Sequence, residues 1–368
     1  MTHSLGDLRV AVVHDWLTGM RGGEQVLEGI LAIVPQAELF TLFHFPGSVS
    51  AAIESHTVHT SYLQRWASRA GDYRRLLPLY PTAIGWDLRK FDLVISSSHC
   101  VAKGVDSRRA PHLCYCHTPM RYVWDRFDDY FPRSQPLRRL AISAVATALR
   151  RWDVRTAGNV TSFVANSEFV RERIRRYYAR DAEVVHPFVD DAFLAPPINN
   201  ERDDYHLVVS ALVPYKRVEL AVQAFRATGR RLVVIGGGPL LSRLRGDAPP
   251  NVEYLGSVPR AEVIERLARA RSLILPGIED FGITPLEAMA LGTPVVALGS
   301  GGVLDSVVPG ETGVFFAEPE VPALVRALDA VERREWDRAA IRRRAERFSR
   351  AAFDGRFRAA VERVLTTT

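Results

Sequence analysis

The chain has 368 residues, of which 47% are hydrophobic and 24% are charged. This composition is typical of a folded globular protein and excludes long disordered tracts, collagen and a small disulfide scaffold. At about 100–200 residues per domain, the length predicts two or three domains. With three cysteines and no secretory pattern at its start, the chain is expected in the cytoplasm.

The formal net charge is +6, but this charge is unevenly distributed. Residues 61–180 hold 22 basic and 10 acidic side chains, so this segment is strongly basic while the rest of the chain is net acidic. A basic segment attracts polyanions such as nucleic acid, anionic lipid headgroups or a phosphorylated substrate. We expect no nucleic-acid partner, because no nucleic-acid recognition motif is present.

Short apolar runs alternate with helical patterns along the first half. A buried strand is predicted at Leu8–His14, a glycine-bearing loop at 15–23 and an amphipathic helix at Glu24–Val34. Further strands are expected at Leu39–Phe43, Phe91–Ser96, His112–Cys116, Ser162–Asn166 and Glu183–His186. This alternation predicts a parallel sheet with helices on both of its faces.

The alternation breaks at Pro187–Asp204, which is rich in Pro, Asp and Asn and is interpreted as a linker. Strands are then predicted at His206–Ala211, Arg231–Gly236, Val252–Leu255, Ser272–Leu275, Val295–Leu298 and Val314–Phe316. Helices are predicted at Val218–Ala227, Ala261–Ala270, Pro285–Leu291, Val321–Val331 and along the tail Arg342–Thr368. We therefore predict an α/β protein with two doubly wound, Rossmann-like domains that face each other across a cleft.

Ligands of such sheets bind beyond the carboxyl ends of the strands, so the loops there are the candidate sites. Gly22 and Gly23 follow the first strand and precede a helix, where close backbone approach and the helix N-terminus suit a phosphate. A tight turn that needs glycine explains them equally well. Both interpretations remain open from this motif alone.

The segment IGGGPLL resembles a dinucleotide-binding fingerprint only in part. Gly236 and Gly238 match its first two glycines, but Leu241 stands where the third is required. A plain turn between a strand and a helix is the better interpretation.

The segment at 275–292 combines an acidic loop with a helix start. Glu279 follows a predicted strand, and Gly282 leaves the N-terminal amides of the next helix open to a ligand. Thr284 is predicted as the helix cap, so Glu287 has a purely structural alternative as the reciprocal acid of a capping box. That alternative does not account for Glu279.

Two further polar residues follow predicted strands. Lys216 is one of only three lysines in the chain and stands near a helix start, where its charge opposes the helix dipole. This placement favours a phosphate contact over a solvated charge. His117 follows an apolar strand, and by itself it is better explained as a hydrogen-bonded structural residue. Cys114 and Cys116 beside it lack a second ligand pair at zinc-like spacing.

These segments together resemble the retaining glycosyltransferases of family 4, which have the GT-B fold. The spacing Glu279-x7-Glu287 in EDFGITPLE is that family's most diagnostic motif, and GTPVVALGSGG and GETGVFF after it are also typical. The segments HDWLTGMRGGEQVL, DLVISSS, CHTPMRYVWD, FVANS and SALVPYKR resemble a bacterial subgroup of mannosyltransferases that build O-antigen and other surface polysaccharides. The resemblance covers nearly the whole chain.

The resemblance implies an acceptor-binding domain over 1–190 and a nucleotide-sugar-binding domain over 205–345. A C-terminal helix at 346–368 is expected to return to the first domain. The implied activity is transfer of a hexose, with GDP-mannose as the expected donor, to a lipid-linked or soluble glycan in surface polysaccharide or glycolipid biosynthesis. The configuration of the sugar is retained. Neither a metal nor another cofactor is expected.

The resemblance also implies roles for individual residues. Glu279 and His117 would contact the donor sugar as the catalytic residues, Glu287 would bind the ribose hydroxyls, and Lys216 would neutralise the diphosphate. Other donor-binding positions would be Gly22, Gly23, Arg217, Val258, Phe281, Gly282 and Ile283. One departure is that Ala211 replaces the arginine of many family members, and Arg217 stands close enough in sequence to compensate.

Residues 60–80 mix aromatic and basic side chains, among them Tyr62, Trp66 and Tyr73. Such mixtures suit a lipid–water boundary, so peripheral docking on an anionic membrane surface is one hypothesis. A solvated helical face is the equal alternative.

Four other functions are weighed against a transferase. A GT-B-fold epimerase remains open, and a phosphorylase would need a lysine that carries pyridoxal phosphate. An NAD-dependent oxidoreductase would use the segment at 235–241, which lacks the third glycine. A non-catalytic carbohydrate-binding relative is disfavoured because Glu279 and Glu287 are both present.

Overall fold

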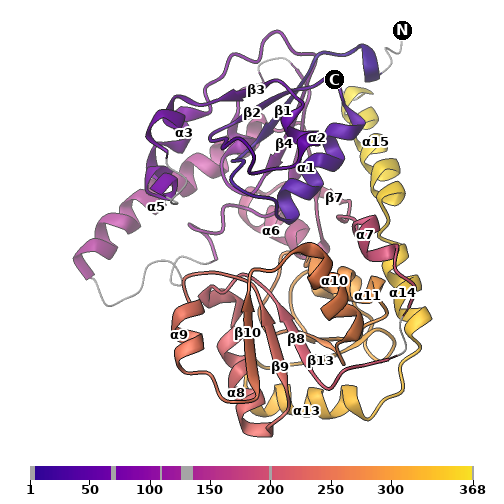
Figure 1. Cartoon of the computed structure of the whole chain (residues 1–368). Helices are drawn as coiled ribbons and strands as arrows, with labels where there is room; N and C mark the ends of the chain where they lie inside the picture. Colours follow the sequence, from indigo (N-terminus) through magenta and orange to yellow (C-terminus); the bar gives the residue numbers. More distant parts are fainter. Residues whose placement is uncertain (1–4, 68–71, 108–109, 126–135, 199–200, 367–368) are drawn as a thin grey trace. The chain divides into compact units, whose positions relative to one another are not determined.

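The computed structural model describes residues 5–67, 72–107, 110–125, 136–198 and 201–366 (Figure 1). These residues form two compact units. The N-unit comprises the residues up to His186 together with those from Phe353 on, and the C-unit comprises Pro187–Ala352. Each unit is built on one sheet in which the paired strands run parallel, as the alternation of apolar runs and helical patterns predicts.

The N-unit sheet has seven strands in the order β3-β2-β1-β4-β5-β6-β7. Their bounds are β1 Val10–His14, β2 Glu38–Thr41, β3 Val58–Thr60, β4 Leu93–Ser98, β5 His112–Cys116, β6 Ser162–Ala165 and β7 Ala182–Val184. The sequence predicted six of these strands to within a few residues and missed β3, which is short and only half-buried.

The helices of the N-unit cover a wide range of lengths. The α-helices are α1 Gly22–Ile33, α2 Ala51–Glu54, α3 Tyr80–Ala83, α5 Pro136–Thr156, α6 Glu168–Tyr178 and α15 Arg350–Thr366, which starts at the end of the C-unit. The 3₁₀ helices are η1 Leu5–Asp7, η2 Tyr62–Trp66, η3 Asp72–Leu79, η4 Ala102–Gly104 and η5 Ala157–Asn159. The predicted tail helix is two helices in the structure, because the chain breaks helical form between Glu346 and Arg350.

The C-unit sheet has six strands in the order β10-β9-β8-β11-β12-β13. Their bounds are β8 His206–Val209, β9 Leu232–Ile235, β10 Val252–Gly256, β11 Leu273–Leu275, β12 Val295–Leu298 and β13 Gly313–Phe316. The sequence predicted all six, because a strand buried on both faces is a continuous apolar run.

The C-unit helices include a short one in the stretch at 187–204. The helices are α7 Asp191–Leu194, η6 Pro214–Lys216, α8 Val218–Thr228, α9 Leu241–Gly246, α10 Arg260–Arg269, α11 Ile283–Ala290, α12 Val303–Ser306, α13 Val321–Glu332 and α14 Arg338–Glu346. The chain before α7 is held to the end of α14, since the Val189 N–H donates to the Phe348 carbonyl over 2.9 Å.

The C-unit core lies on both faces of its sheet, since successive strand residues point to opposite faces. In β8, Leu207 belongs to the cluster packed under α10, α11 and α14. Val208 belongs to the cluster packed under α8 and α13. Both side chains are fully buried. This arrangement is the doubly wound architecture that the sequence predicts.

Strand order reverses once in each sheet, between β1 and β4 in the N-unit and between β8 and β11 in the C-unit. At such a switch point the connections leave on opposite faces and open a crevice beyond the carboxyl ends of the strands. Ligand-binding residues are therefore expected just after β1, β4, β8 and β11.

Candidate functional site

The C-unit switch point brings together two of the predicted site residues. Lys216 ends the 3₁₀ turn after β8, and Glu279 lies in the loop after β11. The Lys216 ammonium forms an ion pair with the Glu279 carboxylate, and each side chain is 17% exposed. A lysine and an acid separated by 62 intervening residues thus meet beyond the carboxyl ends of β8 and β11, where both side chains remain partly exposed to a ligand.

Glycines allow the two loops to lie in contact. A Cβ at Gly277 would lie 2.8 Å from the Lys216 Cα and from the Tyr215 carbonyl oxygen. Gly301 has a φ of +88°, and a Cβ there would lie 2.5 Å from the Glu279 carbonyl oxygen. The Gly302 N–H donates to that same oxygen over 2.9 Å. The sequence interpretation did not assign Gly277 to the site, although its place two residues after a strand is a usable signal.

Helix α11 starts earlier than predicted, which corrects the capping assignment. Gly282 is the N-cap, with a φ of 91°, so Thr284 and Pro285 lie within the first turn. Thr284 is therefore not the cap, and Glu287 is not the reciprocal acid of a capping box. Gly292 lies just beyond the helix with a φ of +70°, in the left-handed form expected of a C-terminal stop.

Glu287 lies on α11 near the starts of two other helices. Burial raises the pKa of its carboxyl to about 7, Arg260 opposes this shift, and Asp190 adds to it. Arg260 and Asp190 pair with each other over 2.5 Å. Glu287 is thus poised to change its protonation near neutral pH.

The remaining predicted donor-binding positions of the C-unit surround this pair in sequence. Phe281 is buried, with its ring 5.9 Å from that of Phe348, and therefore offers its main chain and not its ring. Gly282 and Ile283 form the N-terminal end of α11, where the first N–H groups have no partner inside the helix. Val258 packs at the edge of the apolar cluster under α10.

Arg217 has a left-handed backbone with a φ of 52° between η6 and α8. No acidic side chain in the described part of the C-unit pairs with its guanidinium. The Arg217 residue is half-buried.

The N-unit switch point holds a cluster of three histidines, which we call the histidine cluster: His14, His99 and His117. His14 ends β1, His99 follows β4 and His117 follows β5. Ser97 lies between two of them, with its Oγ 3.1 Å from the His14 Nδ1 and 2.8 Å from the His117 Nε2. The sequence indicated only His117, because sheet register and not sequence spacing places the other two beside it.

The histidine cluster is electrically neutral at its two most buried members. Burial lowers the pKa of His14 to about 3, with the His99 ring adding to the shift. Burial, followed by the charges of His99 and His14, places the pKa of His117 well below its usual value. At neutral pH these two rings are therefore hydrogen-bonding groups and not cations.

Asp15 fixes the loop that carries His99. Its carboxylate accepts the N–H groups of His99, Cys100, Val101 and Ala102, all within 2.8 Å. The His99 Nδ1 lies 3.2 Å from the same carboxylate. Burial raises the pKa of Asp15, and the N–H bonds act against that shift. Asp15 is therefore a structural acid of the cluster.

Gly22 and Gly23 lie in the first turn of α1 and not in a loop, which corrects their predicted placement. The helix starts two residues early because Glu24 accepts the N–H of the N-cap residue Arg21 over 3.1 Å. A Cβ at Gly23 would lie 3.9–4.0 Å from the His14 and His117 rings. The start of α1 thus lies against the histidine cluster.

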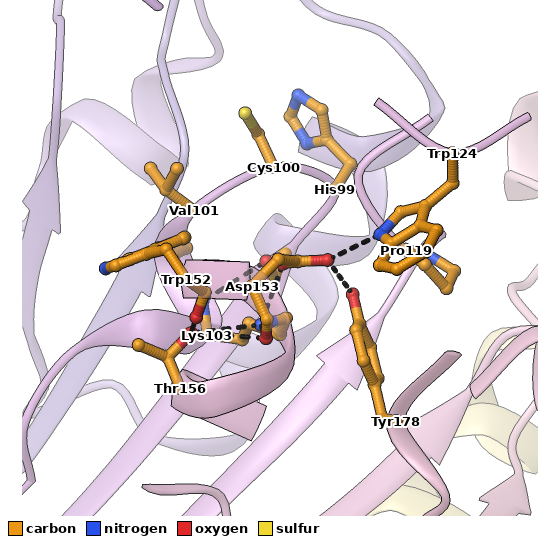
Figure 2. Close-up of polar contacts among 12 residues, drawn as sticks. His99, Cys100, Val101, Lys103, Pro119, Trp124, Trp152, Asp153, Thr156 and Tyr178 are labelled. Atoms are coloured by element: carbon orange, nitrogen blue, oxygen red, sulfur yellow. Dashed lines mark hydrogen bonds and ion pairs between the residues drawn. The ribbon is translucent and has the colours of Figure 1, made fainter. Parts of the chain in front are cut away.

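The other two lysines are paired with other acidic residues. Lys103 is 1% exposed and bonds to Asp153, with its Nζ 2.9 Å from Oδ1 and 2.7 Å from the main-chain oxygen (Figure 2). Asp153 also accepts bonds from Trp124 and Tyr178, each over 2.8 Å. Lys90 pairs with Glu38 at the surface over 2.7 Å.

The glycines at 236–238 have a packing explanation. Gly236 has a φ of +134°, and a Cβ there would lie 1.9 Å from the Ser210 carbonyl oxygen. A Cβ at Gly238 would lie 2.5 Å from the Leu212 carbonyl oxygen. These glycines let β9 pass close to the end of β8, so the oxidoreductase interpretation is not favoured.

The segment at 60–80, which mixes aromatic and basic side chains, is exposed only in part. Tyr62, Trp66 and Leu79 are 43%, 56% and 44% exposed. Tyr73 is buried beneath Trp16 and Phe43, so its predicted place on the surface is wrong. Residues 68–71 of this segment lie outside the described part of the chain.

The described residues contain neither a cluster of metal-ligating side chains nor a membrane-spanning helix. In that part of the chain, no group of three or more His, Cys, Asp or Glu side chains could hold a metal ion. Nor does any described helix combine the length and the apolar character that crossing a membrane requires.

Comparison with known proteins finds a family that most of the C-unit matches. Residues 191–348 match the family Glycosyl transferases group 1. A GDP-mannose-dependent alpha-(1-6)-phosphatidylinositol monomannoside mannosyltransferase of Mycolicibacterium smegmatis is 31% identical over 212 residues, which are 50% of this chain and 54% of that protein. An alpha-1,3/1,6-mannosyltransferase of Neurospora crassa is 26% identical over 277 residues, which are 60% of this chain and 56% of that protein. The chain thus spans about half the length of these curated relatives.

The likeness to solved structures covers both units. The Anabaena protein HepE, crystallised with UDP, has a TM-score of 0.67 and 16% identity over 96% of this chain and 99% of its own. At this identity the likeness shows the fold alone. The chain thus has the GT-B fold, and its residues 191–348 match the group 1 glycosyl transferase family.

Proposed function

We propose that this chain is a retaining family 4 glycosyltransferase that transfers mannose from GDP-mannose to a glycan acceptor. The observation that carries the proposal is the pair of Lys216 and Glu279 at the C-unit switch point, next to the N-terminus of α11. A cation and exposed helix amides suit a diphosphate, and a carboxylate suits sugar hydroxyls. Two curated relatives named as mannosyltransferases support the choice of sugar.

The proposed chemistry is electrostatic. Departure of the nucleoside diphosphate builds negative charge on its β-phosphate, which Lys216 and the α11 N-terminus stabilise as it forms. Arg217 adds a second cation in place of the arginine missing at Ala211. The acceptor hydroxyl attacks on the face that the phosphate leaves, and the phosphate takes its proton. The sugar thereby keeps its configuration without a carboxylate nucleophile.

The other residues bind and orient the donor in this proposal. Glu279 and His117 contact the sugar, and Glu287 accepts bonds from the ribose hydroxyls. The main chain supplies the remaining contacts at Gly22, Gly23, Phe281, Gly282 and Ile283, and Val258 lies against the base. No metal is required, because these groups supply the positive potential that the leaving phosphate needs.

A nucleotide screen tests the donor. A ligand that binds only the folded protein stabilises it and therefore raises its melting temperature. At a ligand concentration of one hundred times Kd, the free energy of unfolding increases by about 2.7 kcal/mol. We expect GDP and GDP-mannose to raise Tm more than UDP, ADP and their sugars. A larger rise in Tm with UDP than with GDP would show that the donor carries uridine and not guanosine. If no nucleotide raises Tm, the proposal is overturned.

We further propose that the acceptor is lipid-linked and that the protein docks on an anionic membrane through the described residues of the segment at 60–80. This surface exposes Tyr62, Trp66 and Leu79 beside the exposed cations Arg65 and Arg75. Anionic vesicles should bind the wild-type chain and lose most binding to Arg65→Ala/Trp66→Ala protein. Leu304→Ala/Arg333→Ala, which removes one exposed apolar and one exposed basic side chain of the C-unit, is the control. Unchanged binding by the first variant would exclude this surface.

A further inference from the structure

Ser97 links the rings of His14 and His117 into one chain of hydrogen bonds. Its Oγ lies 3.1 Å from the His14 Nδ1 and 2.8 Å from the His117 Nε2. A serine hydroxyl has one proton and two lone pairs, and among the described residues the Ser97 Oγ bonds only these two rings, so it donates to one ring and accepts from the other. Two neutral arrangements are possible, and they place the proton of His117 on different nitrogens.

The free nitrogen of His14 decides between them. His14 Nε2 is buried and has no hydrogen-bond partner among the described residues. A buried N–H without an acceptor is rarer and costlier than a bare lone pair. Gly23, in the first turn of α1, lies against the adjacent Cε1, and the positive end of a helix favours a lone pair there. Nε2 therefore carries no proton, and the neutral ring holds its proton on Nδ1.

The direction of the chain follows. His14 Nδ1–H donates to the Ser97 Oγ, and the Ser97 hydroxyl donates to the His117 Nε2. The His117 ring is neutral, so its own proton must lie on Nδ1. The main chain of His117 is fixed as well, because its N–H donates to the Ser98 carbonyl over 2.8 Å and its carbonyl accepts from the Asn166 side chain over 2.9 Å.

We propose that His14 and Ser97 are positioning residues that lock His117 in the Nδ1–H tautomer, so that it presents a neutral hydrogen-bond donor to an oxygen of the ligand. No described residue hydrogen-bonds the His117 Nδ1, and the residue keeps 9% of its surface exposed. Under the proposed function, on which the identity of the ligand rests, that oxygen belongs to a hydroxyl of the donor sugar. His117 then orients the sugar and does not remove a proton from the acceptor.

The tautomer can be measured without a ligand. In protein labelled with ¹⁵N in its histidine rings, protonated and bare ring nitrogens have separate chemical shifts. The His117 signals are assigned by their loss in a His117→Gln sample. We expect a protonated Nδ1 and a bare Nε2 for His117. The opposite tautomer, or an average of the two in the wild-type protein, would overturn the proposal.

Two substitutions of His14 separate positioning from packing. His14→Asn keeps a side-chain N–H close to the position of Nδ1, whereas His14→Leu fills the space without a donor. We expect the wild-type His117 signals in His14→Asn protein and mixed tautomers in His14→Leu protein. Ser97→Ala should mix the tautomers too. Identical His117 signals in all three variants would show that the chain of bonds has no such role.

Activity then tests the consequence. His14→Leu and Ser97→Ala should lower kcat/KM by about tenfold and His14→Asn by less than about threefold, the scale of one neutral hydrogen bond. Thermal unfolding checks that each variant is folded. If no sugar nucleotide binds, the proposed function fails while the tautomer measurement still stands. If transfer occurs with His117 in the other tautomer, only the present proposal fails.

Discussion

Lys216 and Glu279 neutralise each other when no ligand is bound. An anionic phosphate must therefore displace the Glu279 carboxylate from Lys216, or bind to the ammonium beside it. This geometry gives Glu279 two opposite effects, since it competes with the phosphate for Lys216 and yet offers its oxygens to the sugar. The effects separate in a variant that keeps the shape of the side chain and removes its charge.

Glu279→Gln is expected to bind GDP at least as tightly as the wild-type chain, because Lys216 loses its internal counter-charge. Transfer should fall at least about a hundredfold, the scale of losing one charged contact in the transition state. Calorimetry with GDP and a transfer assay measure the two effects. The exposed Glu318→Gln is the control. Wild-type turnover in Glu279→Gln protein would refute the assignment.

Glu287 links stability to pH. Its folded pKa of about 7 exceeds the unfolded value of 4.5, so the folded state binds more protons between these values and stability falls as pH rises through this window. Glu287→Gln should remove about 1–3 kcal/mol of this pH dependence. Urea unfolding at pH 5 and pH 8 measures it. Parallel stability curves for variant and wild-type chains would contradict the shifted pKa.

The affinity for nucleotide should also depend on the protonation of Glu287, but it should increase with pH whereas the stability decreases. Ribose hydroxyls donate to an ionised carboxylate, so affinity for GDP should rise as pH increases through about 7. In Glu287→Gln protein the affinity should be lower and independent of pH across this range. Equal pH profiles for the two proteins would separate Glu287 from the ribose.

The sequence identified some of these residues and missed others for a physical reason. Lys216, Glu279 and Glu287 stand in segments with a recognisable order of strand end, glycine and helix start. His14 is the last residue of β1 and Ser97 the second-to-last residue of β4, and neither has a local sign of function. Only the parallel register of β1 and β4, which pairs His14 with Ser97, brings them together.

At the scale of elements, the strands were predicted better than the helices. A strand buried on both faces is a continuous run of apolar residues, which is a clear pattern in the sequence. Helix α6 is strongly basic, and its buried face rests on Val170, Ile174 and Tyr178 at four-residue intervals, so it was missed. The start of α1 was misplaced because Gly22 and Gly23 suggest a loop, while the Glu24 bond to the Arg21 N–H extends the helix.

Gly236 is expected to be indispensable to the fold of the C-unit. Gly236→Ala would press a methyl group against the Ser210 carbonyl and strain a φ of +134°, so we expect about 2–4 kcal/mol of destabilisation. Gly246→Ala is the matched control, because it lies in α9 with open space around it and should be neutral or stabilising. Chemical denaturation measures both. A harmless Gly236→Ala would revive the interpretation of this segment as a nucleotide-binding loop.

At the scale of the whole molecule, each unit has its own sheet and its own apolar core. This division predicts that nucleotide binding has a regional signature. GDP should slow hydrogen exchange most in η6, in the Glu279 loop and at the start of α11. Hydrogen exchange with mass spectrometry, with and without GDP, would show it. Protection confined to the N-unit would place the nucleotide elsewhere.

The last helix, α15, has a consequence for how the chain is made. The rings of Phe353 and Phe357 lie 6.0 and 6.1 Å from the ring of Tyr115, which is the fourth residue of β5, an interior strand of the N-unit sheet. During translation these phenylalanines leave the ribosome only after the entire C-unit. The N-unit is therefore synthesised first but completed last. A nascent chain stalled before Phe353 would lack the rings that pack against Tyr115, and chaperones could bind there.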